Sequence, residues 1–506
     1  MTFTFLNGCG YMLKRKLTAP AQFQSLDTNS PFLKAHTHDG KVYILSSWKV
    51  DSGTQTVTGQ GELLNANREI LKTGELTIPI DSVAIFETNT QHIPPEVQAR
   101  GIVLFTAAAL AGGIAIYCAS HPKACFGSCP TFYVSDGNQP TLQAEGFSAS
   151  VTPSLEASDI DALYRARPTD SRFEIQMKNE ALETHVVRHV DLLAVKRKSG
   201  GRVFQTADGT FWEVDTIVEP SAAAASEGDC LPLLCAVDGQ ERFSEADSEY
   251  LAARETLNLE FKNVPVGDAG LVIAARQSLM STFLFYQGLA YMGRYAGQWI
   301  AALERGDPNL EKAVTGIGQT LGGIELLLQD DTGKWVSIAE VKETGPLATD
   351  VHLVKLPPIK HPRVNIRLRL TKGHWRLDAV KFVKLGEQLD PVRLAPVAVN
   401  QDGVSADEAH QLLTDRKTAL TTLPGDVYTL VYQLPKDFAN YELFLESRGY
   451  YLEWMREEWL VDENPALAAM MLFNPERALR VLAPEFKKIE VDMEKKFWRS
   501  RYEKPQ

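Results

Sequence analysis

The chain has 506 residues, of which 44% are hydrophobic and 23% are charged. The chain is too long for one compact core, and at about 100–200 residues per domain its length predicts about three domains. The composition predicts folded domains rather than a disordered chain. The formal net charge of −12 argues against a general nucleic-acid-binding protein, because such proteins need a basic surface to displace counterions from phosphates. We therefore expect a folded, multi-domain protein with no nucleic-acid partner.

Residues 1–30 are interpreted as a leader that carries a candidate lipid anchor. Leu6-Asn7-Gly8-Cys9 resembles the end of a bacterial lipoprotein signal, in which the cysteine becomes lipidated. Only eight residues precede Cys9. A normal signal has a basic start and an apolar stretch of about 7–15 residues. Cys9 is the lipidation candidate, and an ordinary chain terminus is the alternative.

Residues 31–95 predict a small β domain. The segments 41–50, 56–64 and 75–88 are rich in β-branched and aromatic residues, and turn residues separate them. This pattern is typical of a small barrel or meander.

Residues 96–122 contain the second membrane signal. The twenty residues from Gly101 to Ser120 carry no charge, which meets the minimum length of a membrane-spanning helix. A helix or hairpin buried inside the protein is the alternative. Either Cys9 is lipidated or residues 101–120 cross the membrane, and both versions place the large C-terminal part outside the cytoplasm.

Four of the six cysteines form two closely spaced pairs, Cys125 with Cys129 and Cys230 with Cys235. In an oxidising compartment such pairs are candidates for small-loop disulfides, and buried reduced thiols are the alternative. The spacings are not CxxC and no histidine pair lies close, so we expect no zinc site and no other metal.

The segment 123–220 predicts a sandwich-like β domain, with a short helix over 156–166 between strands. A linker over 221–254 follows, and the segment Pro220 to Gly228, which overlaps its start, is rich in alanine and serine. Residues 255–390 predict a jelly-roll-like domain with a helical insertion at 278–306.

The insertion 278–306 is apolar almost all round, so it must be buried, and its aromatic residues are interpreted as core. Residues 391–506 predict one strand, over 426–435, followed by helices that end in a basic stretch. We interpret this stretch as a solvated helix face, with contact to anionic lipid headgroups as the alternative.

Motifs of known chemistry are absent from the sequence. It holds no Gly-x-Ser-x-Gly elbow, no Walker A motif and no His-Glu-x-x-His. The glycine-rich run 316–323 lacks a preceding strand, so we expect no bound cofactor. His185 and His189 are interpreted as ordinary surface histidines. No residue is assigned a catalytic role.

One cluster of side chains is a candidate ligand surface. An exposed aromatic ring beside arginine and aspartate can stack on a sugar and bind its hydroxyls. Strand alternation places Trp375 on the core side. The candidate ligand residues are Trp335, His374, Arg376 and Asp378.

Residues 125–460 resemble the non-propeller part of bacterial ASPIC/UnbV-type proteins, which carry integrin-like repeats elsewhere. The resemblance rests on ALETHVVRHVDLLAVKRKSGGRVFQTADGTFWEV (181–214) and on the order of the later strand segments. It implies an extracytoplasmic β architecture and an interaction role. The chain lacks the Asp-rich calcium loops of an integrin-like propeller. The anchor residues of the resemblance are Glu183, Asp191, Trp335, Arg367, Trp375, Asp378, Gly425, Asp426 and Gly449.

Together these features predict a mainly β protein with helical insertions, built from several sandwich or jelly-roll-like domains and a small N-terminal β domain. We expect a membrane-associated binding or scaffold protein of the bacterial cell envelope, mostly extracytoplasmic and with protein partners, acting alone or as a subunit of a larger envelope complex. A carbohydrate ligand is compatible with this hypothesis. The alternative is an envelope carbohydrate-active hydrolase whose active site no motif marks.

Overall fold

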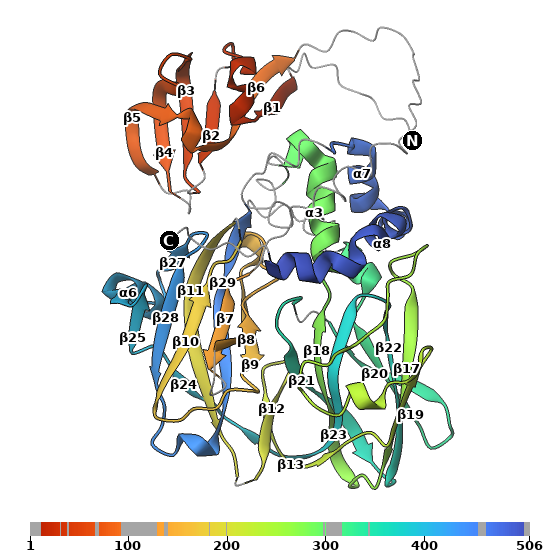
Figure 1. Cartoon of the computed structure of the whole chain (residues 1–506). Coiled ribbons are helices and arrows are strands. Elements are labelled where there is room, and N and C mark those ends of the chain that lie inside the picture. The colour runs from red at the N-terminus through yellow and green to blue at the C-terminus, as the bar shows by residue number, and fades with distance from the viewer. Residues whose placement is uncertain are drawn as a thin grey trace, which may run out of the picture. The chain divides into compact units, whose positions relative to one another are not determined.

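The structure is a computed structural model that describes residues 12–30, 32–37, 40–65, 70–92, 129–135, 140–181, 183–198, 200–296, 299, 316–342, 345–453 and 462–499. The chain divides into two compact units. The predicted fold class is confirmed, because the described residues form five β-sheets and few helices (Figure 1). The first unit comprises Met1–Ile114, Leu289–Trp299 and Trp454–Asn464, and the second comprises Ala115–Gly288, Ile300–Glu453 and Pro465–Gln506.

The first unit contains one antiparallel six-stranded sheet, in the order β1-β6-β2-β3-β4-β5. Its core includes Leu33, Leu45, Ile78 and Phe86, all fully buried. The predicted strand over 75–88 is divided in two, because Pro79 ends β5 and a 3-10 turn precedes β6. The elements are β1 (Met12–Thr18), η1 (Pro20–Ser25), β2 (Leu33–Thr37), β3 (Val42–Asp51), β4 (Thr56–Leu64), β5 (Ile70–Pro79), η2 (Ile80–Ser82) and β6 (Val83–His92).

The second unit stacks four sheets, which we call B, C, D and E. Sheet B has the order β26-β25-β28-β10-β7-β8, and sheet C has the order β24-β11-β29-β9, with β27 also beside β11. Their strands are β7 (Thr131–Ser135), β8 (Pro140–Glu145), β9 (Ala157–Ala162), β10 (Arg172–Lys178), β11 (Glu183–Lys196), β24 (Val392–Leu394), β25 (Ala398–Gln401), β26 (Val404–Ser405), β27 (Leu420–Thr422), β28 (Val427–Gln433) and β29 (Tyr441–Glu453).

Sheet D has the order β13-β12-β21-β18-β23-β16, and sheet E has the order β15-β14-β17-β22-β19-β20. Their strands are β12 (Arg202–Thr206), β13 (Phe211–Val218), β14 (Ala222–Ala225), β15 (Gly228–Asp229), β16 (Arg242–Phe243), β17 (Arg254–Lys262), β18 (Gly267–Gln277), β19 (Ile324–Gln329), β20 (Trp335–Val341), β21 (Asp350–Ile359), β22 (Arg363–Thr371) and β23 (Trp375–Leu389).

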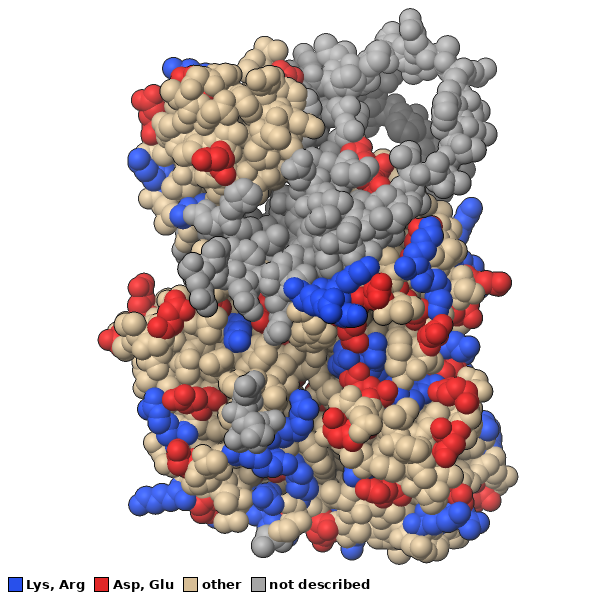
Figure 2. All heavy atoms as spheres, in the orientation of Figure 1, with Lys and Arg blue, Asp and Glu red and all other residues tan. Residues whose placement is uncertain are grey.

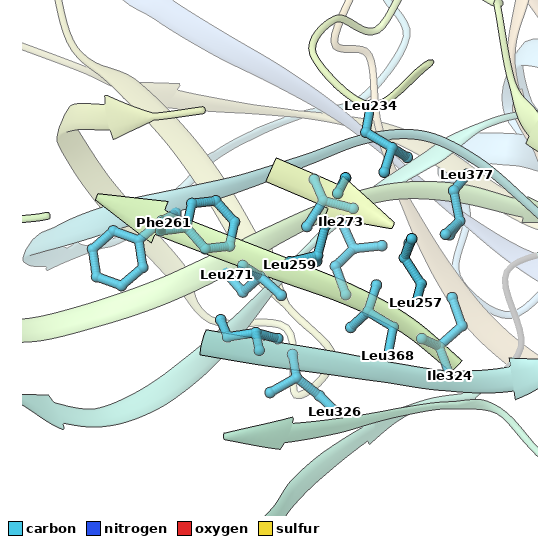
Figure 3. Close-up of a cluster of buried hydrophobic side chains, with 14 of the residues drawn as sticks. Leu234, Leu257, Leu259, Phe261, Leu271, Ile273, Ile324, Leu326, Leu368 and Leu377 are labelled. Carbon is cyan, nitrogen blue, oxygen red and sulfur yellow. The ribbon is translucent and has the colours of Figure 1, made fainter. Parts of the chain in front are cut away.

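Three hydrophobic cores hold the four sheets together. Sheets B and C enclose a core that includes Phe132, Leu192 and Leu430. Sheets D and E enclose a second core, in which side chains of both sheets interdigitate (Figure 3). A third core, with Leu193 of sheet C and Val272 of sheet D, joins the two sandwiches. Sheets C and D are therefore covered on both faces.

This burial explains why the central strands are apolar almost without alternation. In β18, odd positions such as Leu271 face sheet E, whereas Val272 and Ala274 face sheet C. Strands buried on both faces need hydrophobic residues at successive positions. Strand β22 belongs to the outer sheet E, which has one buried and one solvent face, so buried and exposed residues alternate regularly along it.

The two sandwiches are not consecutive in the chain. Strand β10 pairs with β28, and β11 pairs with β29, so residues 131–196 and 392–453 build one sandwich. Residues 202–389 build the other sandwich between these two halves. The sequence pattern had assigned 123–220 and 391–506 to separate regions.

Few helices accompany the sheets. Of the helix predicted over 278–306, the described residues show α3 (Met280–Met292), which ends where Gly293 takes a φ of +50°. Residues 297, 298 and 300–306 lie outside the described residues. Of the five aromatic residues interpreted as core, Tyr286 and Tyr291 are buried, Phe285 and Trp299 are half-buried, and Tyr295 is exposed, so the interpretation is confirmed only in part. Other helical elements are η3 (Pro153–Leu155), η4 (Leu231–Leu233), η5 (Gly293–Tyr295), α6 (Asp407–Thr414), η6 (Phe438–Asn440), α7 (Pro465–Phe473) and α8 (Pro475–Arg499), and residues 316–321 are also helical.

Helix α8 is clamped to sheet D by charged side chains. Arg276 of β18 is nine-tenths buried and forms ion pairs with Glu241 and with Glu494 of α8. Arg376 of β23 pairs with the same two carboxylates. The network fixes the helix across the end of the sheet.

Two predicted segments take a different structure. Residues 156–166 were expected to be helical, and that prediction is wrong, because residues 157–162 form β9 beside β29. Residues 441–453 belong to a region expected to be helical, yet they form β29, a central strand of sheet C. In both cases pairing with distant strands prevails over local propensity.

The two predicted membrane signals, Cys9 and residues 101–120, stay predictions. Within the part of the chain that the structure describes, no helix has the length and apolar character needed to cross a bilayer. Cys9 and the apolar segment 101–120 lie outside the described residues.

Candidate functional site

The residues predicted to form a ligand surface are divided between two sheets. Trp335 begins β20 in sheet E. His374 directly precedes β23 of sheet D, and Arg376 and Asp378 belong to this strand. The structure therefore does not bring Trp335 together with the other three.

The three residues near β23 are committed to structural contacts. His374 is buried, its Nε2 lies 3.2 Å from Nε2 of Gln277, and burial lowers its pKa to about 3. The Arg376 guanidinium lies 3.9 Å from the Phe243 ring centroid, beside the carboxylates that it pairs with. Asp378 accepts the backbone N–H groups of Asp238 and Gly239. Trp375 is fully buried, as predicted.

The cysteine pairs show no bridge among the described residues. Cys230 and Cys235 are free thiols: Sγ of Cys230 donates to Glu227 and Sγ of Cys235 donates to the carbonyl of Leu231. Burial raises the pKa of both thiols. Cys129 is buried, and Cys125 lies outside the described residues. Oxidative pairing stays a prediction.

The outer face of sheet E is the main candidate surface for a ligand. Alternation along β22 sends Val364, Ile366 and Leu368 into the core, so Asn365 and Arg367 point to the opposite face. In β19, Leu326 is likewise in the core and Gln329 pairs with Trp335 in register. The inner face of sheet E is therefore filled by core side chains, and its polar outer face is exposed to solvent.

Trp335 stands in an ordered polar setting on this face. The Arg367 guanidinium lies 3.9 Å from the centroid of the half-buried indole ring. Arg367 Nε also donates to Asn258 Oδ1 at 2.7 Å, which fixes the guanidinium. Next to it, Asn365 Nδ2 donates to Gln329 Oε1 at 2.8 Å. An aromatic ring and planar polar groups are thus held in place before any ligand binds.

A pocket of about 400 Å³ adjoins this face at the open side of the D–E sandwich. Gln329 lines it, as do the apolar side chains Leu328, Val336 and Ile338. On its rim the ring of His361 lies 3.5 Å from a carboxylate oxygen of Asp331. Pro357 and Pro358 of β21 also line it, and they offer no N–H group to pair with another strand.

A second candidate site is a group of acidic residues where sheets B, C and D meet. Glu145 ends β8, Asp159 and Asp161 lie in β9, and Asp350 begins β21 beside His352. Asp350 Oδ2 lies 2.6 Å from His352 Nε2. Oxygen atoms of Glu145 and Asp161 are buried without a hydrogen-bond partner. Burial of a carboxyl without a hydrogen-bond partner disfavours its ionised form.

The protonation of these carboxyls is shifted in opposite directions. Burial raises the pKa of Glu145 to about 8, although Leu347 and Ala348 N–H groups donate to it. Burial and the negative charge of Asp350 raise the pKa of Asp159 to about 6, and burial raises the pKa of Asp161 well above its ordinary value. Asp350 is also buried, but the His352 imidazole holds its pKa below the usual range.

The histidines of β11 are buried, so the interpretation as surface residues is wrong. His185 Nε2 lies 2.8 Å from Glu183 Oε1 inside the protein. His189 is buried next to Asp191 and Glu446, and donor atoms of these three lie within 4.8 Å of one another. A bulge at Arg188 interrupts the register between His185 and His189.

Charged side chains of both signs are mixed over the face shown in Figure 2, with no single-sign surface.

Comparisons with known proteins add little to these observations. No family profile matches the chain, and no curated protein matches it. Among solved structures, a β-porphyranase of glycoside hydrolase family 86 from the human gut bacterium Bacteroides plebeius is similar, with 8% identity over 50% of this chain and 43% of that chain. Its TM-score is 0.17, which carries no argument about fold or function. The resemblance to ASPIC/UnbV-type proteins stays a prediction.

Proposed function

We propose that this protein is a binding protein whose ligand is an oligosaccharide, held on the outer face of sheet E. The observation that supports this most is Trp335, a half-buried ring on a solvent-facing sheet, flanked by a fixed guanidinium and by paired amides. Sugar rings bind by stacking their C–H faces on an aromatic ring while planar polar groups bind their hydroxyls. The ring face away from Arg367 is the stacking surface.

The adjoining pocket supports the same function. Its apolar lining accepts a deoxy or acyl substituent of a sugar, and Gln329 belongs both to the pocket and to the polar face. The binding surface therefore extends from Trp335 past the β19–β20 hairpin. A flat, open surface of this kind suits a chain of sugars better than a single small molecule.

Replacing Trp335 by alanine is expected to weaken polysaccharide binding about tenfold or more, because the stacking surface is lost. Affinity electrophoresis with dextran, laminarin, xylan, polygalacturonate and muropeptides measures this. The matched control is Trp212→Ala, which removes another half-buried indole, whose ring lies under Lys355 at 4.0 Å in sheet D. No retardation of the wild type by any glycan, or equal losses in both variants, would contradict the proposal.

We also propose that the protein belongs to the bacterial cell envelope, anchored to a membrane and mostly outside the cytoplasm. The supporting signals, Cys9 and residues 101–120, are in the sequence. Replacing Cys9 by serine and fractionating the cells separates the two anchors: release from the membrane supports lipidation, and retention supports residues 101–120. Recovery of the wild type from cytosol with reduced thiols would sink this placement. Affinity purification from gently solubilised membranes tests for a protein partner.

A hydrolase acting on the same class of ligand is the second candidate, and the acidic group at the sheet junction favours it. Carboxyls whose pKa values are driven apart are the arrangement that acid–base catalysis needs. Asp159 and His352 are partly exposed, so they mark the approach to the group. Release of reducing ends from a bound polysaccharide, abolished in Asp159→Asn and kept in Glu174→Gln, would establish this function. Binding without release leaves the binding protein.

A further inference from the structure

Three potential metal ligands meet on one side of sheet C. His189 and Asp191 are two residues apart in β11, so their side chains share a face. Glu446 of the neighbouring strand β29 is the register partner of Asp191. One nitrogen or oxygen atom of each residue lies within 4.8 Å of the other two. Nothing in this geometry depends on the proposed ligand face of sheet E.

The donor atoms are buried and partly unused. His189, Asp191 and Glu446 are 8%, 0% and 8% exposed. Asp191 Oδ1 and His189 Nε2 have no hydrogen-bond partner, and Nε2 is 3.6 Å from Glu446 Oε1. Buried polar atoms are nearly always hydrogen-bonded. Two buried atoms without a partner, on side chains that share a strand face, therefore indicate that a binding partner is missing.

Two arginines occupy the other oxygen atoms of the carboxylates. Arg393 Nη1 lies 2.7 Å from Asp191 Oδ2 and also contacts Glu446 Oε2, and Arg416 Nη2 lies 2.5 Å from Asp191 Oδ2. These contacts orient the carboxylates and leave Asp191 Oδ1 without a hydrogen-bond partner and Glu446 Oε1 3.6 Å from His189 Nε2. Donors that orient a ligand in this way are usual around protein metal sites.

We propose that His189 Nε2, Asp191 Oδ1 and Glu446 Oε1 form a binding site for a divalent transition-metal ion of the zinc type. One imidazole and two carboxylates suit Zn²⁺, Co²⁺ or Mn²⁺, whereas Ca²⁺ and Mg²⁺ prefer oxygen ligands alone. Metal–ligand bonds of about 2.0–2.2 Å require the three atoms to move slightly closer together. Three protein ligands leave a coordination position for water.

The arginines set the strength of the site. Their two positive charges offset the two carboxylates, so a metal ion adds charge that no further acidic group balances. Both guanidinium side chains are 47% exposed, and solvent therefore screens part of this repulsion. Removing Arg416 takes away one positive charge and keeps all three donors. Arg393 still contacts both carboxylates and keeps them oriented, so the loss of Arg416 strengthens metal binding.

Titration calorimetry of the full chain with Zn²⁺, and visible absorption with Co²⁺, test the site. We expect one tight site in the wild type, at least tenfold weaker binding in His189→Ala and in Asp191→Asn, and tighter binding in Arg416→Met. The matched control is His361→Ala, which removes an exposed histidine that also lies beside a carboxylate. Wild-type affinity in both ligand variants, no binding by the wild type, or weaker binding in Arg416→Met would overturn the proposal.

Discussion

Replacing Glu145 by glutamine is expected to flatten the pH dependence of the free energy of unfolding between pH 5 and 8. In the folded protein, burial raises the pKa of Glu145 to about 8, whereas its ordinary value is 4.5. Between these two values the folded state binds a proton that the unfolded state has lost. Stability therefore falls as pH rises, by about 1.4 kcal/mol per pH unit for one full proton.

The sign of this effect distinguishes Glu145 from an ordinary ion-paired carboxylate. Its stabilising contribution is complete below the unfolded pKa and is lost as pH rises through the folded pKa of about 8. Asp159 adds a similar fall at lower pH, because its folded pKa is about 6. Glutamine cannot ionise, and its side-chain oxygen still accepts the N–H groups of Leu347 and Ala348.

Urea unfolding at pH 5, 6, 7 and 8 measures the slope for the wild type and for Glu145→Gln. The matched control is Glu174→Gln, an exposed carboxylate paired with Arg172, which should keep the wild-type slope. If Glu145→Gln keeps the wild-type slope, the Glu145 carboxyl is already ionised at pH 5 in the folded protein. That result would contradict the expectation that burial raises its pKa.

Replacing Trp375 by alanine is expected to lower the free energy of unfolding by about 3–5 kcal/mol. The indole is among the largest fully buried side chains, and it fills the core between sheets D and E. Truncation leaves a cavity that flanking strands cannot close, because β23 pairs with β13, β16 and β18 along its length.

Phenylalanine at position 375 is expected to cost far less, because the ring still fills the core. The Trp375 Nε1 has no hydrogen-bond partner, so phenylalanine also removes an unsatisfied buried donor. Chemical denaturation compares Trp375→Ala, Trp375→Phe and the surface variant Trp335→Ala, whose change should stay within about 0.5 kcal/mol. Equal losses in the alanine and phenylalanine variants would contradict the packing explanation.

Strands with one solvent face were the most predictable part of the fold. The alternation in 364–371 predicts β22, and the structure places this strand at Arg363–Thr371. The helix predicted over 156–166 is wrong. Ala157, Ala162 and Leu163 favour a helix locally, but pairing with β29 makes residues 157–162 a strand. The two-residue spacing of Asp159 and Asp161 was the sequence feature that indicates a strand with both acidic side chains on one face.

The candidate sites show where sequence reasoning stops. Trp335 could be selected from its residue type, but Arg367 and Asn258 come from strands whose order in sheet E no local pattern reveals. The acidic group combines Glu145 with Asp350, about two hundred residues later, and only the contact between the two sandwiches brings them together. His374 and Arg376 were selected with Trp335, yet sheet pairing places them on another layer.

The route of the chain through the two sandwiches has a consequence during synthesis on the ribosome. Residues 202–389 emerge as one continuous stretch and can close their own layers first. The surrounding sandwich has to wait for β29 (Tyr441–Glu453), which inserts between β11 and β9. A nascent polypeptide halted before residue 441 would therefore hold the sandwich of sheets D and E without α8, together with unpaired edges of β9 and β11. This is the state in which a chaperone is needed most.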